Sequence, residues 1–152
     1  MYNVVADKIK EVVDRIKELE RMAYYDTLTG AFNRNALESV KKNYDEVGVY
    51  VTYVDVNGLK VVNDKLGHEH GDQLLHYVVY MLRELSKKNI IFRIGGDEFL
   101  VIGKQHVILN IPEVSYGTVY KHEGCELDFA ISQAEVLMKI YKKENFFQRR
   151  EF

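Results

Sequence analysis

Three carboxylates in this sequence stand where they could hold a divalent cation together. Asp55 ends the apolar run "YVTYVD", and Asp97 and Glu98 follow two glycines between the apolar runs "IIFRI" and "FLVIG". Carboxylate oxygens suit Mg²⁺, an ion that proteins often share with the phosphates of a substrate. Two such ions can activate an attacking hydroxyl and neutralise a leaving pyrophosphate. The same spacing also fits unrelated surface acids. Whether the three carboxylates can share a cation depends on the strands and turns that carry them.

Two further polar residues, Asn63 and Asp72, stand on either side of "GHEHG". An amide offers a donor and an acceptor, and a carboxylate accepts from ring and amino N–H groups, so this pair could read the edge of a purine. In the alternative, Asn63 lies at a helix end and Asp72 is the N-cap of a helix that begins near Gln73, a role that can coexist with binding. Because no cysteine or third imidazole stands nearby, His68 and His70 are interpreted as loop residues and not as metal ligands.

The apolar runs around the three acids read as strands. Residues 46–56 form a run of alternating and continuous apolar residues that is typical of a buried strand. Gly95 and Gly96 between two β-branched runs predict a hairpin, because glycine adopts the positive φ that primed turns require. Two more strands are expected, at residues 105–111 and 112–121.

Helical spacing of apolar residues predicts the elements that cover the sheet. Helices are expected from about Asn33, over residues 71–89 and over residues 129–145, with one short helical patch within residues 57–72. The alternation of strand, helices, hairpin, strand and helix predicts an α+β fold, with a mostly antiparallel sheet flanked by helices.

The N-terminal segment has the heptad pattern of a two-stranded coiled coil. Its apolar positions alternate spacings of four and three residues: Val5, Ile9, Val12, Ile16, Leu19 and Ala23. An amphipathic helix packed on its own domain is the alternative. We favour a self-association stalk over residues 1–23, which leaves residues 24–152 as one globular domain.

Composition excludes several classes of protein. The 152 residues carry a net charge of −2, so no basic field favours a nucleic acid as partner. A single cysteine excludes an internal disulfide framework, and we expect Cys125 to be a buried or half-buried apolar residue. No window reads as a signal peptide or a membrane span, so we expect a cytoplasmic protein without a membrane partner.

Three blocks of the sequence together resemble one known family. The blocks "DTLTGAFNR" (residues 26–34), "DVNGLKVVNDKLGHEHGD" (residues 55–72) and "RIGGDEF" (residues 93–99) are similar, in this order and spacing, to the GGDEF domain of diguanylate cyclases. The resemblance implies a palm-like fold of the nucleotidyl-cyclase or ferredoxin-like type. It also implies that two GTP molecules are condensed into cyclic di-GMP with release of two pyrophosphates.

The resemblance implies a homodimer as well. Each monomer would hold one GTP, and two facing active sites would let each 3′-hydroxyl attack the α-phosphate of the other nucleotide. The N-terminal helix would join the two copies. A monomer would therefore be inactive, since one half-site holds only one reactant.

Roles of single residues follow from the same resemblance. Asp55 and Asp97 would hold two Mg²⁺ or Mn²⁺ ions per active site, with the Val56 carbonyl as a further ligand. Glu98 would assist metal binding or deprotonate the 3′-hydroxyl. The remaining implied contacts are guanine recognition by Asn63 and Asp72, triphosphate binding along Leu59 and Lys60, and phosphate binding by Lys142. The signature loop consists of Gly95, Gly96, Asp97, Glu98 and Phe99, and its glycines would leave room for a phosphate.

Individual positions depart from the family pattern. Ser86 and Asn89 replace the two ends of the inhibitory R-x-x-D motif, so feedback inhibition through that site is expected to be absent. Asn57 replaces a second acid of the strand motif. Phe146 stands where an arginine is expected to contact phosphate, and Arg149 or Arg150 is a candidate substitute.

The connection over residues 103–113 is short, because the family has a full helix there. Either a short strand replaces that helix or the sheet is rewired, and in both cases the back face of the sheet is expected to lose cover. An active compact diguanylate cyclase is the leading hypothesis. A GTP-binding or dimerisation module without turnover and a cyclase for another nucleotide remain open, although Asp72 favours guanine.

Overall fold

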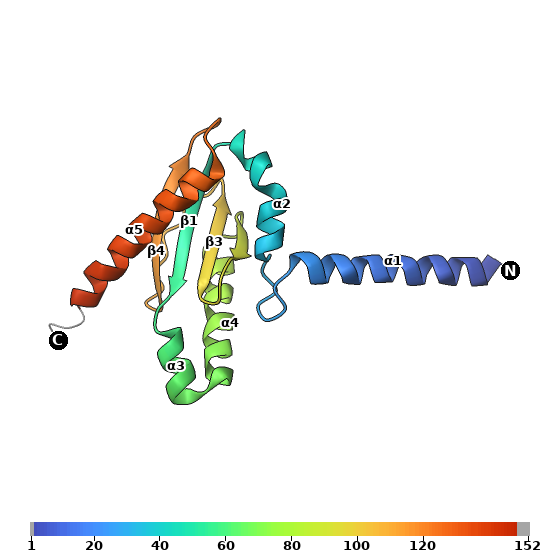
Figure 1. The fold of residues 1–152 in the computed structure, drawn as a ribbon, viewed down its shortest axis with the longest axis horizontal. Coiled ribbons are helices and arrows are strands. Elements are labelled where there is room, and N and C mark those ends of the chain that lie inside the picture. Colours follow the sequence, from blue (N-terminus) through green and yellow to red (C-terminus); the bar gives the residue numbers. More distant parts are fainter. Residues whose placement is uncertain (1, 149–152) are drawn as a thin grey trace.

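The computed structural model describes residues 2–148 and shows a four-stranded antiparallel sheet with helices on both faces (Figure 1). The elements are α1 (Tyr2–Tyr24), α2 (Arg34–Asp45), β1 (Val49–Val56), α3 (Leu59–Leu66), α4 (His68–Leu85), β2 (Ile90–Arg93), β3 (Glu98–Gly103), β4 (Val114–Lys121) and α5 (Leu127–Gln148). The strand order is β2-β3-β1-β4. The predicted α+β class is therefore confirmed, with β1 at the centre of the sheet.

The predicted hairpin exists, but its turn differs from the predicted one. Between β2 and β3 the chain makes a four-residue loop, in which the backbone N–H groups of Ile94 and Gly95 donate to the Glu98 carbonyl at 2.9 and 3.3 Å. Neither Gly95 nor Gly96 has a positive φ, so the prediction of a primed turn is wrong. A longer loop turns the chain without left-handed residues.

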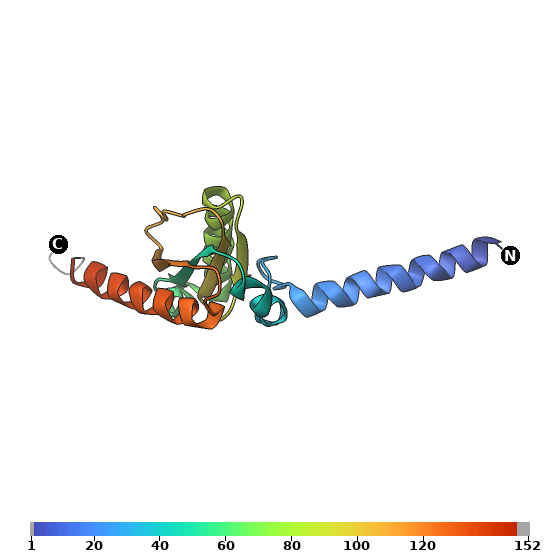
Figure 2. The same ribbon diagram turned by 90° about the horizontal axis from the view of Figure 1, so that it is seen from above.

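Alternate residues of each strand divide between two cores, as the period of two in a strand requires. On one face β1 packs against α2 and α5, and on the other face it packs against α4 (Figure 2). The α2 and α5 side includes Val49, Val51, Tyr53, Leu37, Leu100, Ala134 and Met138, and the α4 side includes Val54, Val56, Leu75, Val78, Leu82, Phe99 and Val101.

The segment between β3 and β4 contains no strand, so the strand predicted at residues 105–111 is wrong. The segment pairs with neither β2 nor β4, the strands at the two edges of the described sheet. Its apolar alternation has another cause: Val107, Leu109 and Ile111 are buried in the core on the α4 side. The face that was expected to lose cover is thus covered by α4 and by this irregular segment.

Asn89 fixes the start of that short connection. Its side-chain amide donates to the Gln105 carbonyl at 2.8 Å and accepts from the Gln105 N–H at 3.1 Å. A Cβ on Gly103 would lie 2.1 Å from the Asn89 Oδ1 atom, so glycine leaves the space that this amide occupies. Ser86 is buried and donates its hydroxyl to the Leu82 carbonyl. Ser86 and Asn89, which replace the two ends of the inhibitory motif, therefore form hydrogen bonds to the protein backbone with their side chains.

Helix α1 extends away from the rest of the protein (Figures 1 and 2). None of its residues from Tyr2 to Tyr24 is buried, and the seam residues Val5, Ile9 and Val12 are each more than half exposed. The alternative in which this helix packs on its own domain is therefore wrong. No helix within residues 2–148 is long and apolar enough to cross a membrane. Cys125, expected to be buried or half-buried, is exposed.

Candidate functional site

The three carboxylates singled out in the sequence come together at the signature loop. One ligand oxygen from each of Asp55, Asp97 and Glu98 lies within 4.8 Å of the other two. Asp55 is opposite Glu98 in the pairing of β1 with β3, and the Val56 N–H donates to the Asp97 carbonyl at 2.8 Å. The strand register thus places the acids side by side, although they are far apart in sequence.

Gly95 leaves space for the carboxylate of Glu98. A Cβ at Gly95 would lie 2.6 Å from the Glu98 Oε2 atom, whereas a Cβ at Gly96 would meet no heavy atom within 4 Å. The two glycines therefore do different things. Gly95 admits a side chain of the site, and Gly96 leaves the outer part of the loop open, where the family resemblance implies a phosphate.

Lys142 from α5 contacts the most buried of the three acids. Its ammonium donates to the Asp55 Oδ2 atom at 2.5 Å, and the Asp55 side chain is only 7% exposed. The helix reaches this position because Gly117 in β4 lets it lie directly on the sheet. A Cβ there would be 2.4 Å from the Ala134 carbonyl oxygen and 2.5 Å from the Met138 nitrogen. The resemblance implied that Lys142 binds phosphate, and the contact with Asp55 was not foreseen.

The surroundings of Asp55 change its ionisation. Burial raises the pKa of the Asp55 carboxyl, the hydrogen bond and charge of Lys142 act in the opposite direction, and the Asp97 carboxylate raises it again. The net pKa of Asp55 lies above its ordinary value. Because the single charge of Lys142 does not offset burial and the charge of Asp97, a divalent cation would stabilise the ionised form of Asp55 more than the ammonium does.

Tyr53 also belongs to the site, although the sequence reasoning did not single it out. Burial raises the pKa of its phenol, and a hydrogen bond to Glu98 and the charges of Glu98, Glu135 and Asp55 raise it further. The available signal was its place in the strand, since Tyr53 and Asp55 share one face of β1.

The residues present fit a hard divalent cation. Every donor in the cluster is a carboxylate oxygen, which suits Mg²⁺ and Mn²⁺ better than a softer metal. The ammonium of Lys142 already lies against Asp55, so the position accepts positive charge. Val56 is buried, and its N–H donates to the Asp97 carbonyl. That the Val56 carbonyl is a metal ligand stays a prediction.

Asn63 and Asp72 lie on the adjoining helices α3 and α4. The amide of Asn63 covers Gly71, where a Cβ would be 1.7 Å from the Asn63 Oδ1 atom, and Asp72 is the next residue and is exposed. The structure therefore brings the pair close. Their role in binding guanine stays a prediction, as does that of Leu59 and Lys60 at the start of α3.

The predicted N-cap role of Asp72 is wrong. Helix α4 begins at His68, and its N-cap is Gly67, whose φ of 92° separates α3 from α4. His68 and His70, interpreted as loop residues, belong to the first turn of α4, so the helix begins earlier than predicted and Asp72 lies inside it. Glycine made this stretch look irregular, but Gly71 is needed for close contact between the two helices.

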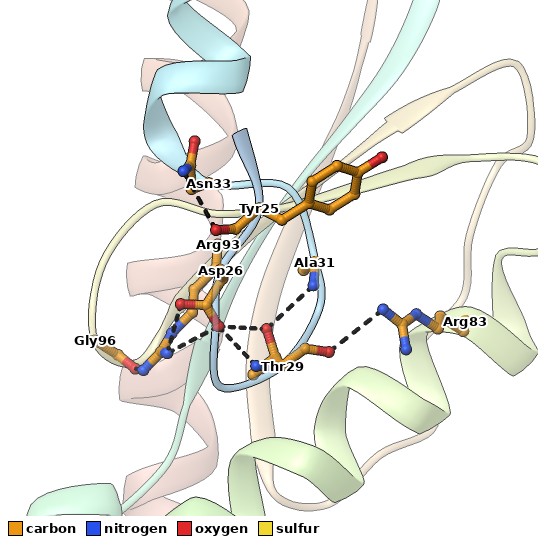
Figure 3. A network of polar contacts seen from close by, with 8 residues as sticks. All are labelled: Tyr25, Asp26, Thr29, Ala31, Asn33, Arg83, Arg93 and Gly96. Carbon is orange, nitrogen blue, oxygen red and sulfur yellow. Dashed lines mark hydrogen bonds and ion pairs between the residues drawn. The ribbon is translucent and has the colours of Figure 1, made fainter. Parts of the chain in front are cut away.

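Asp26 connects the turn that follows α1 to the signature loop (Figure 3). Its carboxylate accepts from the Thr29 N–H at 2.8 Å, from the Thr29 hydroxyl at 2.6 Å and from Arg93 at 3.1 Å. Arg93 also donates to the Gly96 carbonyl at 2.7 Å. The block "DTLTG" thus has a structural role, because it holds the arginine that precedes the glycines.

Two departures from the family pattern are visible in the structure. Asn57 accepts a hydrogen bond from the Ser115 hydroxyl at 2.8 Å, so its side chain stabilises the end of β1 against β4. Phe146 lies one turn beyond Lys142 and is 54% exposed. Arg149 and Arg150, named as candidate substitutes for the expected arginine, lie outside the described residues.

Comparison with known proteins identifies relatives across most of the chain. The profile of the family described as "Diguanylate cyclase, GGDEF domain" matches residues 23–140. Signaling protein YkoW of Bacillus subtilis is 42% identical over 96 residues, which cover 57% of this chain and 12% of that protein. Diguanylate cyclase VdcA of Vibrio cholerae is 25% identical over 97% of this chain and 52% of its own length.

A solved structure has the same fold. The coiled coil and GGDEF domain of DgcB from Caulobacter crescentus, in complex with c-di-GMP, superposes with a TM-score of 0.79. The alignment has 18% identity and covers 92% of this chain and 91% of that one. Some relatives are named cyclic di-GMP phosphodiesterases, and the chain spans only 10–14% of those proteins.

Proposed function

Because the chain belongs to the GGDEF domain family, we propose that it is a diguanylate cyclase that condenses two GTP molecules into cyclic di-GMP and releases two pyrophosphates. One observation carries this proposal: the cluster of Asp55, Asp97 and Glu98, which lies at an intact signature loop. Relatives named diguanylate cyclase support the same activity.

The reaction needs positioning and charge neutralisation more than covalent chemistry. Two Mg²⁺ or Mn²⁺ ions, when bound, would neutralise phosphate charge and favour ionisation of the attacking hydroxyl. Asp55 and Asp97 hold these ions in this proposal, with the Val56 carbonyl as a further ligand. Glu98, whose carboxylate lies beside Gly95, assists the metal or takes the proton of the 3′-hydroxyl.

Substrate contacts are assigned to the edges of the cluster. Asn63 and Asp72 read guanine, since a carboxylate accepts from both the ring N–H and the amino group of that base. The start of α3, at Leu59 and Lys60, lines the triphosphate, and Lys142 binds phosphate. A substitution tests the base preference: Asp72→Ser should weaken the preference for GTP over ATP, and an unchanged preference would contradict this assignment.

A homodimer with facing active sites completes the proposal. Each copy holds one GTP, so turnover requires two copies, and the exposed apolar seam of α1 supports their pairing. This predicts that product forms faster than linearly with protein concentration.

The deciding experiment incubates the purified chain with GTP and Mg²⁺ and identifies products by mass spectrometry. Cyclic di-GMP should form, and Asp55→Asn and Asp97→Asn should each abolish it while the protein stays folded. Glu123→Gln, which changes an exposed acid in the turn before α5, is the matched control and should keep full activity. Cyclic di-GMP production by the Asp55→Asn variant would contradict the proposed mechanism.

A second candidate function is a GTP-binding or dimerisation module without turnover. Phe146 at the position of an expected phosphate-binding arginine favours this candidate. So do relatives named phosphodiesterases, in which the matched segment is a minor part. GTP that binds in calorimetry but stays intact at high protein concentration would establish the module, and a different cyclic product would indicate a cyclase for another nucleotide.

A further inference from the structure

The contact between Lys142 and Asp55 joins two groups that the proposed function uses for different partners. Asp55 is assigned to a divalent cation and Lys142 to phosphate, but in the structure the ammonium donates directly to the Asp55 carboxylate at 2.5 Å. A cation cannot bind the same oxygen at full strength while the ammonium holds it. The two contacts therefore exclude one another or weaken one another.

Asp55 needs a positive partner whenever it is ionised. Its side chain is 7% exposed, and the carboxylates of Asp97 and Glu98 approach it within 4.8 Å. Leaving a buried carboxylate unpaired beside two others costs free energy, which the ammonium reduces when no metal is present. Neighbouring Lys139 forms its own ion pair with Glu135 at 2.9 Å, so Lys142 supplies the charge at Asp55.

Lys142 is also able to leave. Its side chain is 51% exposed although its ammonium contacts a buried acid, and a lysine carries its charge on a flexible four-carbon stem. Since α5 is fixed by the close approach of its backbone to Gly117, the side chain can turn outward without any movement of the helix.

We propose that Lys142 is an internal counter-ion of Asp55 that a divalent cation displaces, so that the lysine is released for phosphate only when the cation has bound. This inference rests on the proposed metal site and extends it, because it couples loading of the cation to exposure of a phosphate-binding group. Binding of cation and nucleotide would then be cooperative through one side chain.

The test measures Mn²⁺ affinity in the nucleotide-free protein, with free Mn²⁺ followed by electron paramagnetic resonance. Lys142→Met removes the competitor and should bind Mn²⁺ about fivefold more tightly than the unaltered chain, the ratio expected for losing one partly exposed ion pair. Lys143→Met removes an equal charge from the next residue of α5 and is the matched control. It should change Mn²⁺ affinity by much less.

One additional variant and one additional readout keep the test decisive. Lys142→Arg retains the charge and should keep the Mn²⁺ affinity near that of the unaltered chain even if Lys142→Met folds poorly. Thermal unfolding gives an independent readout: saturating Mn²⁺ should raise the midpoint more for Lys142→Met than for the unaltered chain, because that variant lacks a counter-ion until metal binds.

Equal Mn²⁺ affinities for Lys142→Met and Lys143→Met would overturn the counter-ion role. If Asp55→Asn still abolished Mn²⁺ binding in that case, the proposed function would stand. If the proposed metal site itself were wrong, the unaltered chain and Asp55→Asn would bind Mn²⁺ equally weakly.

Discussion

Arg93 contacts both carboxylate oxygens of Asp26 at 3.1 Å and donates to the Gly96 carbonyl at 2.7 Å. One guanidinium therefore fixes the turn after α1 and the turn that carries the proposed catalytic acids (Figure 3). The planar fork of arginine makes both contacts at once, which a lysine cannot do.

We predict that Arg93→Lys lowers the free energy of unfolding by about 1–3 kcal/mol, because one lysine ammonium cannot replace both the Nη1 contact with the partly buried Asp26 carboxylate and the Nη2 contact with the Gly96 carbonyl. Urea denaturation checks the value. Arg83→Lys is a matched control, since Arg83 contacts the same turn only through a 3.4 Å hydrogen bond to the Thr29 carbonyl. Equal losses for both variants would show that the contact with Asp26 has no special weight.

The pH dependence of stability provides a second check on Asp26. Burial raises the pKa of this carboxyl, but hydrogen bonds from Thr29 and the hydrogen bond and charge of Arg93 together lower it below the ordinary value of 3.8. The folded state therefore gains stability from ionised Asp26 above that pH and loses it as the pH falls through the lowered pKa. Asp26→Asn should be less stable than the unaltered chain near pH 6, and the gap should narrow in acid.

Asp55 should show the opposite behaviour. Because burial and the Asp97 charge outweigh Lys142 and raise the pKa of Asp55, the metal-free folded state holds this proton more strongly than the unfolded chain. Stability contributed by protonated Asp55 is present below the unfolded pKa and is lost as the pH rises through the raised pKa. In EDTA at neutral pH, Asp55→Asn should thus be more stable than the unaltered chain. Lower stability of the variant would contradict this sign.

Substitution of Gly117 and of Gly96 by alanine should have different effects on stability, because only Gly117 is packed against another element. Gly117→Ala would place a Cβ 2.4 Å from the Ala134 carbonyl oxygen, so we expect a loss of about 1–3 kcal/mol as α5 moves off the sheet. Gly96→Ala meets no heavy atom within 4 Å and should keep its stability. Guanidinium denaturation compares the two. If Gly96→Ala proved the less stable variant, the loop geometry described above would be wrong.

Asn89 should matter for folding and not for feedback control. Asn89→Ala removes both hydrogen bonds to the Gln105 backbone, and we expect a cost of about 1–2 kcal/mol together with faster amide exchange in residues 104–113. Asn110→Ala, in an exposed position of the same connection, is the control. Hydrogen exchange that is faster only in distant elements would contradict this role.

The sequence predicted the parts of the site that depend on local pattern. The strand that carries Asp55 followed from its run of alternating and continuous apolar residues, and the hairpin before Glu98 followed from two glycines between β-branched and aromatic runs. Pairing of these strands in the sheet brings the acids together. The start of α4 was missed because Gly67 and Gly71 look alike in sequence, yet one separates two helices and the other lies inside a helix.

Contacts that depend on how whole elements pack could not be read from pattern. The pair of Lys142 and Asp55 depends on how closely α5 approaches β4 at Gly117, which no local signal reveals. Likewise, the alternating apolar residues at 105–111 indicated a strand that the structure does not contain. Alternation reports that one side of the segment is buried, but it does not show that the backbone pairs with another strand.

In the proposed homodimer, the exposure of α1 would make the shape of the protein depend on its concentration. A helix of 23 residues is about 35 Å long, and helices in proteins owe most of their stability to packing of an amphipathic face, which α1 does not bury against its own domain. Where two copies meet along the apolar seam, the helix is reinforced, and where they do not, it frays. Circular dichroism of increasingly dilute samples should then lose helical signal. The helical content of α1 would therefore report the fraction of copies that are paired at a given protein concentration.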